Sequence, residues 1–241
     1  MAPDLIAFDG VVAGYGALTI LNSLTFGARA GEVTLFIGPN GAGKSTVLKT
    51  LFGLLSPRAG TIRLGGRDVA GAKPAAMLRQ GMAFVPQGRN LFPSLSVRHN
   101  LELGAITLPP SRRRARFDEA IGRFPHLQQR IDNQASTLSG GEQKQLEIAR
   151  ALQLRPRVIL VDEPSIGLSP IVARQVFQLL RSLAEAGTTV LMVEQNVRAA
   201  LAVSDRVLLL EGGRLMLDSP AAKLLDDPDL NRFFLGKAVA H

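Results

Sequence analysis

The sequence predicts an α/β fold in which a core of alternating strands and helices carries an antiparallel β layer and a mostly helical insertion. Two β-rich segments, residues 5–12 and 19–28, open the chain on either side of a Gly-Tyr-Gly turn, which predicts an antiparallel pair. The apolar run 33–37 leads into a glycine-rich loop and a helix expected over residues 44–54, the order that opens an α/β unit. A further β segment is expected at residues 60–64.

The insertion is predicted between residues 93 and 137. There the apolar pattern becomes helical, β-branched residues are few, and Pro109-Pro110 interrupts it. The alternation of helices and strands then returns, with a helix over residues 141–154 and a buried strand over 158–161. The remaining expected elements are a helix over 170–186, a strand over 188–193, a strand pair turning at Gly212-Gly213, and a short helix.

Composition places the chain among folded globular proteins. Of its 241 residues, 46% are hydrophobic and 20% are charged, far from the signature of disorder. We expect one domain, with residues 1–86 and 156–241 forming a catalytic core and β subdomain and residues 87–155 forming a helical subdomain. The absence of cysteine excludes disulfides and thiolate metal sites and favours the cytosol. No signal peptide is recognisable, and the apolar runs are shorter than the roughly 18–20 residues that span a bilayer.

A net charge of +8 raises nucleic acid or an anionic membrane surface as a partner. The one dense basic run has acidic residues just after it and no interleaved aromatic residues for stacking on bases. We interpret it as a solvated helix face, with a contact surface as the alternative. Its members are Arg112, Arg113, Arg114 and Arg116.

A glycine-rich loop between the first predicted core strand and its helix fits the phosphate-binding pattern G-x-x-x-x-G-K-[ST]. Its glycines let backbone N–H groups converge on phosphate oxygens, its lysine neutralises β/γ-phosphate, and its serine hydroxyl binds Mg²⁺. The next residue, Thr46, is placed to reach the α-phosphate side. The loop consists of Gly38, Pro39, Asn40, Gly41, Ala42, Gly43, Lys44 and Ser45.

Two further motifs carry chemistry. Asp162 and Glu163 end an apolar strand, where α/β sheets present ligand-binding groups. Asp162 can hold Mg²⁺, and Glu163 can orient the attacking water; a solvated strand end is the plainer alternative. A serine followed by two glycines at a helix start makes a second anion-binding nest, for which simple N-capping is the alternative. This motif comprises Leu138, Ser139, Gly140, Gly141 and Glu142.

In this order, the motifs resemble those of the ATP-binding cassette ATPases from about residue 15 to residue 217. The resemblance implies a P-loop NTPase core of the RecA type that binds ATP and Mg²⁺. It identifies the phosphate loop with Walker A, Asp162 and Glu163 with Walker B, and residues 138–142 with the signature motif. It also identifies Gln87 with the Q-loop glutamine, which contacts the metal or γ-phosphate, and Tyr15 with the aromatic residue that stacks on adenine.

The same resemblance implies that two cassettes sandwich ATP, the signature of one chain capping the nucleotide on Walker A of the other. Residues 88–101 would dock membrane subunits. Three positions depart from the family pattern. Glu142 stands where the signature commonly has Gln, Ser169 replaces an Asp that contacts the opposite site, and Gln195 occupies the switch position usually held by His. An amide can bind γ-phosphate but cannot become cationic, so Glu163 would carry catalysis.

The motifs at residues 86–93, 138–143, 163–168 and 193–196 together resemble the shorter of the two ATPases of bacterial branched-chain amino-acid importers, and the urea and amide importers look very similar. This implies transmembrane permease partners and a second cassette of different sequence, with a homodimer as the alternative. It also implies a cytoplasmic position on the inner face of the membrane. No nucleic-acid partner is expected. Nucleic-acid factors built on the same cassette usually carry two cassettes, a long coiled-coil insertion or zinc ligands, and a P-loop kinase gives no reason for residues 138–142.

Overall fold

Two sheets organise the computed structural model, which describes residues 4–225. The larger sheet has six strands, and five of them, from β9 to β6 in space, are parallel, while β10 pairs antiparallel with β9. In spatial order the strands are β10 (Arg214–Pro220), β9 (Arg206–Glu211), β3 (Val33–Ile37), β8 (Thr189–Val193), β7 (Val158–Asp162) and β6 (Met82–Val85).

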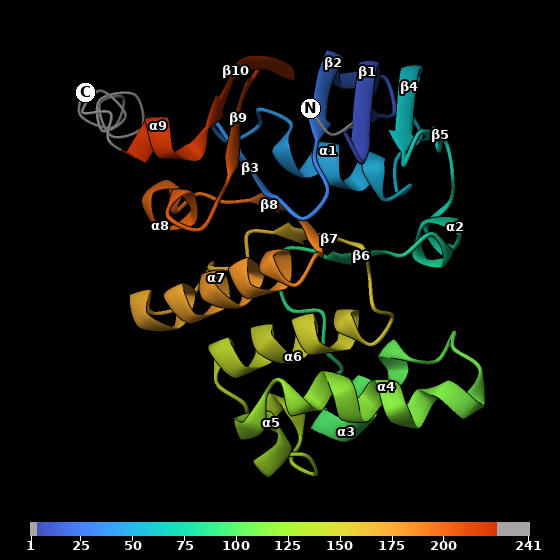
Figure 1. Cartoon of the computed structure of the whole chain (residues 1–241), viewed down its shortest axis with the longest axis vertical. Helices are drawn as coiled ribbons and strands as arrows, with labels where there is room; N and C mark the ends of the chain where they lie inside the picture. The colour runs from blue at the N-terminus through green and yellow to red at the C-terminus, as the bar shows by residue number, and fades with distance from the viewer. Residues whose placement is uncertain (1–3, 226–241) are drawn as a thin grey trace.

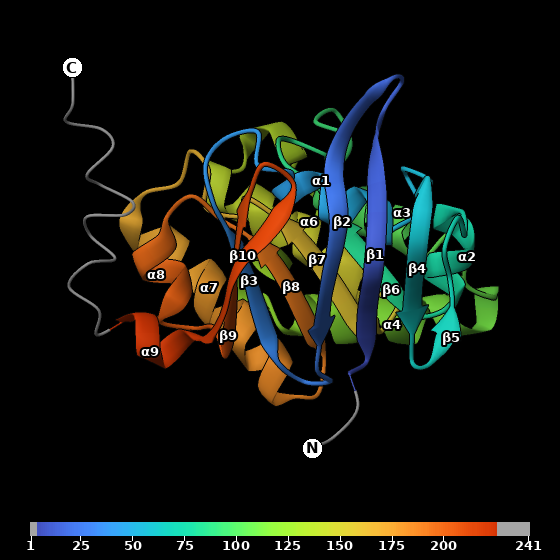
Figure 2. The ribbon, with the colours of Figure 1, turned by 90° about the horizontal axis from the view of Figure 1, so that it is seen from above.

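The second sheet is antiparallel and covers one side of the first. Its order is β2 (Leu18–Ala28), β1 (Ile6–Tyr15), β4 (Ala59–Leu64) and β5 (Arg67–Asp68). Helix α1 (Lys44–Leu51) contacts both sheets, and in the view from above the antiparallel strands lie over it (Figure 2). The antiparallel β layer predicted from the sequence is therefore confirmed.

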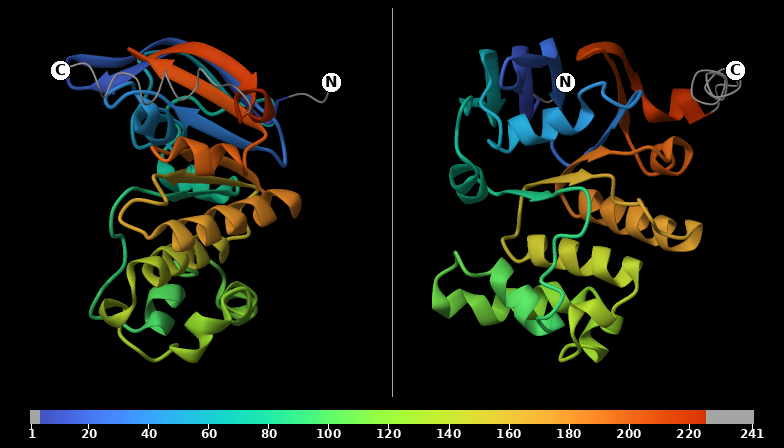
Figure 3. Two further views of the ribbon diagram at one scale, coloured as in Figure 1. Left: turned by 90° about the vertical axis from the view of Figure 1, so that its left-hand side faces the viewer. Right: turned by 180° about the vertical axis from the view of Figure 1, so that it is seen from behind.

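Helices cover the opposite face of the six-stranded sheet. The layer nearest the sheet contains α6 (Gly140–Leu152) and α7 (Pro170–Glu185). Beyond α6, at the end of the molecule farthest from the antiparallel sheet, are α3 (Val97–Gly104), α4 (Pro110–Gly122), α5 (Pro125–Gln129) and the 3₁₀ turn η1 (Ala135–Thr137), as Figures 1 and 3 show. Three short helices complete the described chain: α2 (Pro74–Arg79), α8 (Val197–Leu201) and α9 (Ala221–Leu225).

Side chains that point alternately to the two faces of the six-stranded sheet build two hydrophobic cores. Leu35 and Met192 face the core that includes α6 and α7, whereas Phe36, Leu191 and Leu160 face the core shared with α1 and the antiparallel sheet. Because side chains alternate along a strand, strands buried on both faces read as continuous apolar runs. The helical core continues without a break from the sheet through α6 into α3, α4 and α5. The division at residues 87 and 155 stays a prediction.

Several element boundaries differ from those expected. Helix α1 ends at Leu51 because Gly53 adopts φ 83°, in the left-handed region that stops a helix. Pro110 begins α4 as well as interrupting the apolar pattern, since proline fits the first turn of a helix. Elements α2, β6 and α8 were not predicted from the sequence, because they are too short for a clear periodicity. Within residues 4–225, no helix combines the length and hydropathy that crossing a bilayer requires.

Candidate active site

The phosphate-binding pattern lies between β3 and α1, as predicted. Two of its glycines are required by backbone geometry. Gly38 has φ 141° and a Cβ there would lie 2.0 Å from the Leu210 carbonyl oxygen, while Gly43, which precedes α1, has φ 101°. Only glycine adopts such conformations at little cost, so the loop can turn tightly and present its N–H groups at the start of α1.

Lys44 is the first residue of α1 and is only 6% exposed. Its Nζ donates to the carbonyl oxygens of Gly38, at 2.7 Å, and Pro39, at 3.0 Å, so the ammonium group lies across the loop. Burial lowers the pKa of Lys44, and the carboxylates of Glu163 and Asp162 oppose that shift. A desolvated ammonium group held here is suited to compensating phosphate charge.

Ser45 and Asp162 meet across the site. The Ser45 hydroxyl donates to Asp162 Oδ1 at 2.9 Å, and burial raises the pKa of Asp162 while this hydrogen bond opposes the rise. A hydroxyl and one carboxylate fit Mg²⁺, which binds proteins through few oxygen ligands and takes the others from phosphate and water. Among residues 4–225, no cluster of three or more His, Cys, Asp or Glu side chains offers an all-protein metal site.

Glu163 lies at the centre of a hydrogen-bonded trio. Its Oε2 accepts from Gln87 Nε2 and its Oε1 accepts from Gln195 Nε2, each at 2.7 Å. The three residues follow β6, β7 and β8, which are neighbours in the sheet, so their carboxyl ends open at one edge. The structure thus brings together three residues that were predicted to act around the γ-phosphate and its metal.

The backbone at Glu163 is unusual. It has φ 49°, the left-handed region that non-glycine residues rarely enter, and its N–H donates to the Val193 carbonyl oxygen at 2.9 Å. Such strain persists only where the surroundings hold it, and it clusters at functional sites. Here the turn directs the carboxylate, which is 7% exposed as a residue, between the two amides.

Glu194 is a further site residue, for which no role was predicted from the sequence. It is 2% exposed, and its Oε1 accepts from the Ser165 N–H at 2.7 Å. Its Oε2 accepts from the N–H groups of Gln195, at 3.0 Å, and Asn196, at 3.2 Å. Glu194 therefore holds the loops after β7 and β8 together. The signal in the sequence that could have identified Glu194 is its position as an acidic residue directly after a buried strand.

Tyr15 ends β1 and is 44% exposed, beside α1. Lys49 of α1 places its Nζ 5.9 Å from the centre of the tyrosine ring. Thr46 is buried on the same helix. An exposed ring at this position leaves a face for stacking, which is compatible with the predicted adenine contact.

The serine-glycine motif begins α6, on the other face of the six-stranded sheet from α1. Ser139 caps the helix, and Glu142 Oε2 accepts from the Ser139 N–H and hydroxyl, both at 2.8 Å. Burial raises the pKa of Glu142, but the Ser139 hydrogen bonds, together with the charges of Arg130 and His126, outweigh it and leave the pKa lowered. A Cβ at Gly141 would lie 2.2 Å from Val172 Cγ1, so close packing also requires glycine there. The N-capping interpretation is correct for the local structure.

Because α1 and α6 cover opposite faces of the sheet, this motif and the phosphate loop do not form one site within the chain. Ser169, at the position of a family Asp, caps α7 by accepting from the Val172 N–H at 3.5 Å.

A sequence model described as ABC transporter matches residues 21–166, more than half of the chain. The high-affinity branched-chain amino acid transport ATP-binding protein BraG of Pseudomonas aeruginosa is 38% identical over 96% of this chain and 100% of its own length. The chain belongs to the ABC transporter family. It is an ATPase of that family, as the sequence predicted.

Other relatives of this ABC transporter ATPase serve different systems. The lipopolysaccharide export system ATP-binding protein LptB of Acidithiobacillus ferridurans is 32% identical, with 97% of each chain covered. Among solved structures, an ATP-binding cassette of an ABC transporter in its ADP conformation superimposes with a TM-score of 0.87 at 25% identity, covering 98% of this chain and all of that one. A dimeric cassette in a post-hydrolysis state with ADP and Pi gives a TM-score of 0.76 at 27% identity, covering 90% of this chain and 98% of that one. The predicted fold class is confirmed.

Proposed function

We propose that this chain powers a bacterial importer of branched-chain amino acids by hydrolysing ATP at the site around Lys44, Asp162 and Glu163. The observation that carries the hydrolytic part is the Glu163 carboxylate, held between two amides beside the Ser45 and Asp162 pair. The likeness to BraG over 96% of this chain and 100% of that protein supports the importer and its substrate class.

In this proposal each residue has one task. The loop N–H groups, Lys44 and Thr46 would hold the phosphates. Ser45 and Asp162, with the side-chain oxygen of Gln87, would hold Mg²⁺, which would neutralise phosphate charge. Glu163 orients and polarises the attacking water for in-line displacement at γ-phosphate.

Two further side chains position the reacting groups. Gln195 fixes the side of Glu163 that faces γ-phosphate through one charge-assisted hydrogen bond, and Tyr15 stacks on adenine. Phosphoryl transfer depends mainly on positioning and electrostatic stabilisation, which a rigid trio of this kind provides.

A second cassette supplies the remaining edge of the site. The residues from Ser139 to Glu142 lie away from this chain's own phosphate loop, which supports their donation to the nucleotide of a partner. The dimeric cassette that resembles this chain supports such a pairing. We expect a partner of different sequence, with a homodimer as the alternative outcome.

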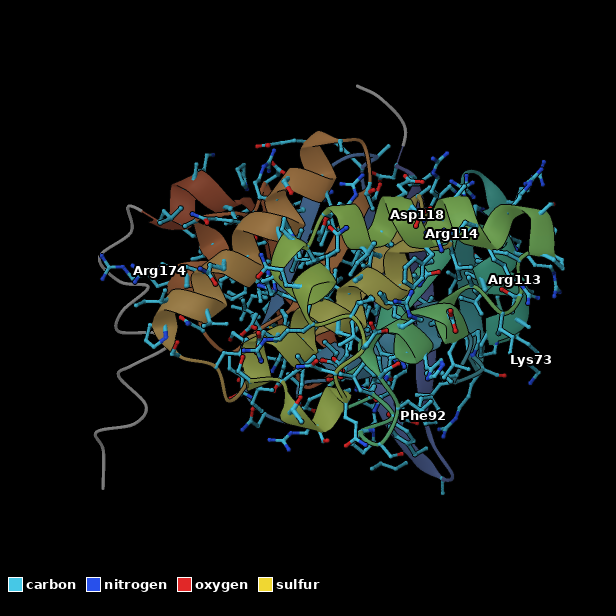
Figure 4. The ribbon with its side chains drawn as sticks, turned by 90° about the horizontal axis from the view of Figure 1, so that it is seen from below. Lys73, Phe92, Arg113, Arg114, Asp118 and Arg174 are labelled. Atoms are coloured by element: carbon cyan, nitrogen blue, oxygen red, sulfur yellow. The ribbon has the colours of Figure 1, made fainter. Side chains whose placement is uncertain are left out.

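The permease is proposed to dock at a groove of about 250 Å³ between β6, α2, α3 and α6. Asn90 and Pro86 line its edge, next to the loop that follows Gln87, and its wall is mostly apolar. Figure 4 shows Phe92 on the face viewed from below; the residue is 52% exposed and lies in the segment 88–101 predicted for docking. The cassette would then sit on the cytoplasmic face of the membrane, with residues 87–155 responding as one helical subdomain.

The nucleic-acid alternative is weakened by the basic run of α4. Arg114 pairs with Asp118 at 2.9 Å, and the two are labelled side by side in Figure 4. Arg116 pairs with Glu119 at 3.2 Å, and Arg113 donates to the carbonyl oxygens of Leu108 and Ile106. These contacts involve three of the four guanidinium groups of the run, which favours the solvated-face interpretation.

Purification of the chain with its native membrane partners, followed by reconstitution in proteoliposomes, tests the proposal. ATP-dependent uptake of leucine, isoleucine or valine is expected, and Lys44→Ala should abolish it. Uptake of urea or short amides, with no uptake of leucine, would assign the chain to the urea and amide importers instead. Copurification with nucleic acid and no permease would overturn the transport proposal.

A further inference from the structure

A buried ion pair on α6 lies against the backbone that follows Gln87. Lys144 Nζ is 2.5 Å from Glu147 Oε2, one helical turn away, and the two side chains are 6% and 3% exposed. Neither residue belongs to the phosphate loop, the Glu163 trio or the Ser139 motif. Burying two charges costs free energy that their attraction often fails to recover, so the pair is not explained by stability alone.

Both charged groups also bind the loop. Glu147 Oε1 accepts from the Asn90 N–H at 2.6 Å, and Lys144 Nζ donates to the Gly88 carbonyl oxygen at 3.3 Å. The Asn90 side chain donates to the Pro86 carbonyl oxygen at 3.0 Å, which ties the loop back to the end of β6. The loop is therefore fastened to α6 on one side and to the core sheet on the other.

These contacts lie between two parts of the nucleotide machinery. At one end, Gln87 donates to Glu163, next to the proposed γ-phosphate position. At the other end, α6 is one continuous helix of 13 residues that begins at the Ser139 cap. Because a helix moves as a rigid element, a displacement at residues 144–147 is carried to its first turn.

We propose that Lys144 and Glu147 are positioning residues that lock the loop after Gln87 to α6. Through this lock, nucleotide contacts at Glu163 and Gln87 set the position of residues 139–142 at the start of α6. This chain donates those residues to the nucleotide of its partner. The inference rests on the proposed function for the nucleotides at Glu163 and at the start of α6. The lock itself rests on the contact geometry alone.

The decisive variant removes the lock without leaving a buried charge. In Lys144→Met/Glu147→Leu both charges are replaced by apolar groups, a change that is often neutral or stabilising for a buried pair. A milder variant, Lys144→Met/Glu147→Gln, keeps an acceptor for the Asn90 N–H. The matched control is Arg114→Gln/Asp118→Asn, which removes an exposed ion pair on α4 that has no contact with the loop.

The absence of cysteine allows clean labelling of the full chain. Gln128→Cys on α5 and Gln178→Cys on α7 place spin labels at exposed positions on the two sides of α6. Pulsed electron spin resonance then measures the distance between the labels with and without AMP-PNP and Mg²⁺, and a fluorescent ATP analogue measures binding.

With the lock intact, AMP-PNP should shift the distance between the labels. The Met/Leu variant should bind the analogue with unchanged affinity but lose the shift, and its kcat should fall about fivefold or more at unchanged KM, the lower end of ordinary coupling between sites. The milder variant should give an intermediate response, and the control should behave as the parent does.

Four outcomes separate the explanations. A Met/Leu variant that keeps both the shift and kcat would show that the pair only stabilises the fold, and so would a parent that binds AMP-PNP without any shift. If the Met/Leu variant does not fold, the milder variant decides, since a full shift in it removes any role for the ion pair. A parent that fails to bind AMP-PNP would instead contradict the proposed function.

Discussion

Replacement of the central carboxylate, Glu163→Gln, tests the chemistry most directly. The substitution preserves shape, but an amide has one acceptor oxygen and one NH₂ group. Glu163 now accepts from two NH₂ groups, those of Gln87 and Gln195, each at 2.7 Å. In the variant, one of these neighbours must turn its own amide to present oxygen, so at most one hydrogen bond to a charged group, about 1.5–3 kcal/mol, is lost from the fold.

The expected loss of turnover is larger. General-base catalysis contributes about 10²- to 10⁴-fold, or roughly 3–5 kcal/mol of barrier. Hydrolysis should therefore nearly stop, while ATP binding is preserved and a nucleotide-bound dimer accumulates. Phosphate release at saturating ATP and Mg²⁺ measures the first effect, and size-exclusion chromatography with bound-nucleotide analysis measures the second.

The control is Glu185→Gln at the end of α7, which removes one exposed carboxylate far from the site and should leave turnover unchanged. A Glu163→Gln variant that hydrolyses ATP within a fewfold of the parent rate would refute the reasoning, because another group would then activate the water.

The other predictions concern binding, positioning and charge. Lys44→Ala should weaken ATP binding about 10- to 100-fold, which corresponds to the free energy of one hydrogen bond to a charged group. Turnover equal to that of the parent would contradict the assignment of Lys44 to the phosphate site. Gln195→Ala should slow hydrolysis about 2- to 12-fold, less than Glu163→Gln. Gln195→His should stay active and gain a pH dependence between about pH 6 and 7, where imidazole changes charge; a flat profile would place residue 195 away from γ-phosphate. Replacement of the arginines in residues 112–116 by Gln should leave ATPase activity and DNA binding unchanged, whereas loss of tight, salt-sensitive DNA binding would restore the nucleic-acid interpretation.

Short-range features of the site could be predicted from the sequence, because they depend on residues close together in the chain. The phosphate loop, with Lys44 and Ser45 at its end, requires only a strand, glycines with positive φ and a helix start. Strand β3 has the predicted bounds, Val33–Ile37, for the same reason: a continuous apolar run is itself the mark of a strand buried on both faces.

Long-range pairings were decided by the tertiary structure. Ser45 and Asp162 are 117 positions apart, and Glu163 is 76 positions from Gln87 and 32 from Gln195, yet each pair is in hydrogen-bonding contact. The sequence assigned Gln87 and Gln195 by resemblance, but it could not show that both amides bind the carboxylate of Glu163. Their meeting follows from the order β8-β7-β6 in the sheet.

The lock on α6 shows the same limit. The spacing of Lys144 and Glu147 predicts an ordinary helical ion pair, which is normally exposed. Only the packing of α6 against the loop at Gly88 and Asn90 buries it and gives it partners 56 and 57 positions away. Hydrophobic periodicity reports which face of an element is buried, but the residues that meet there are set by how separate elements pack, and neighbouring sequence carries no record of that choice.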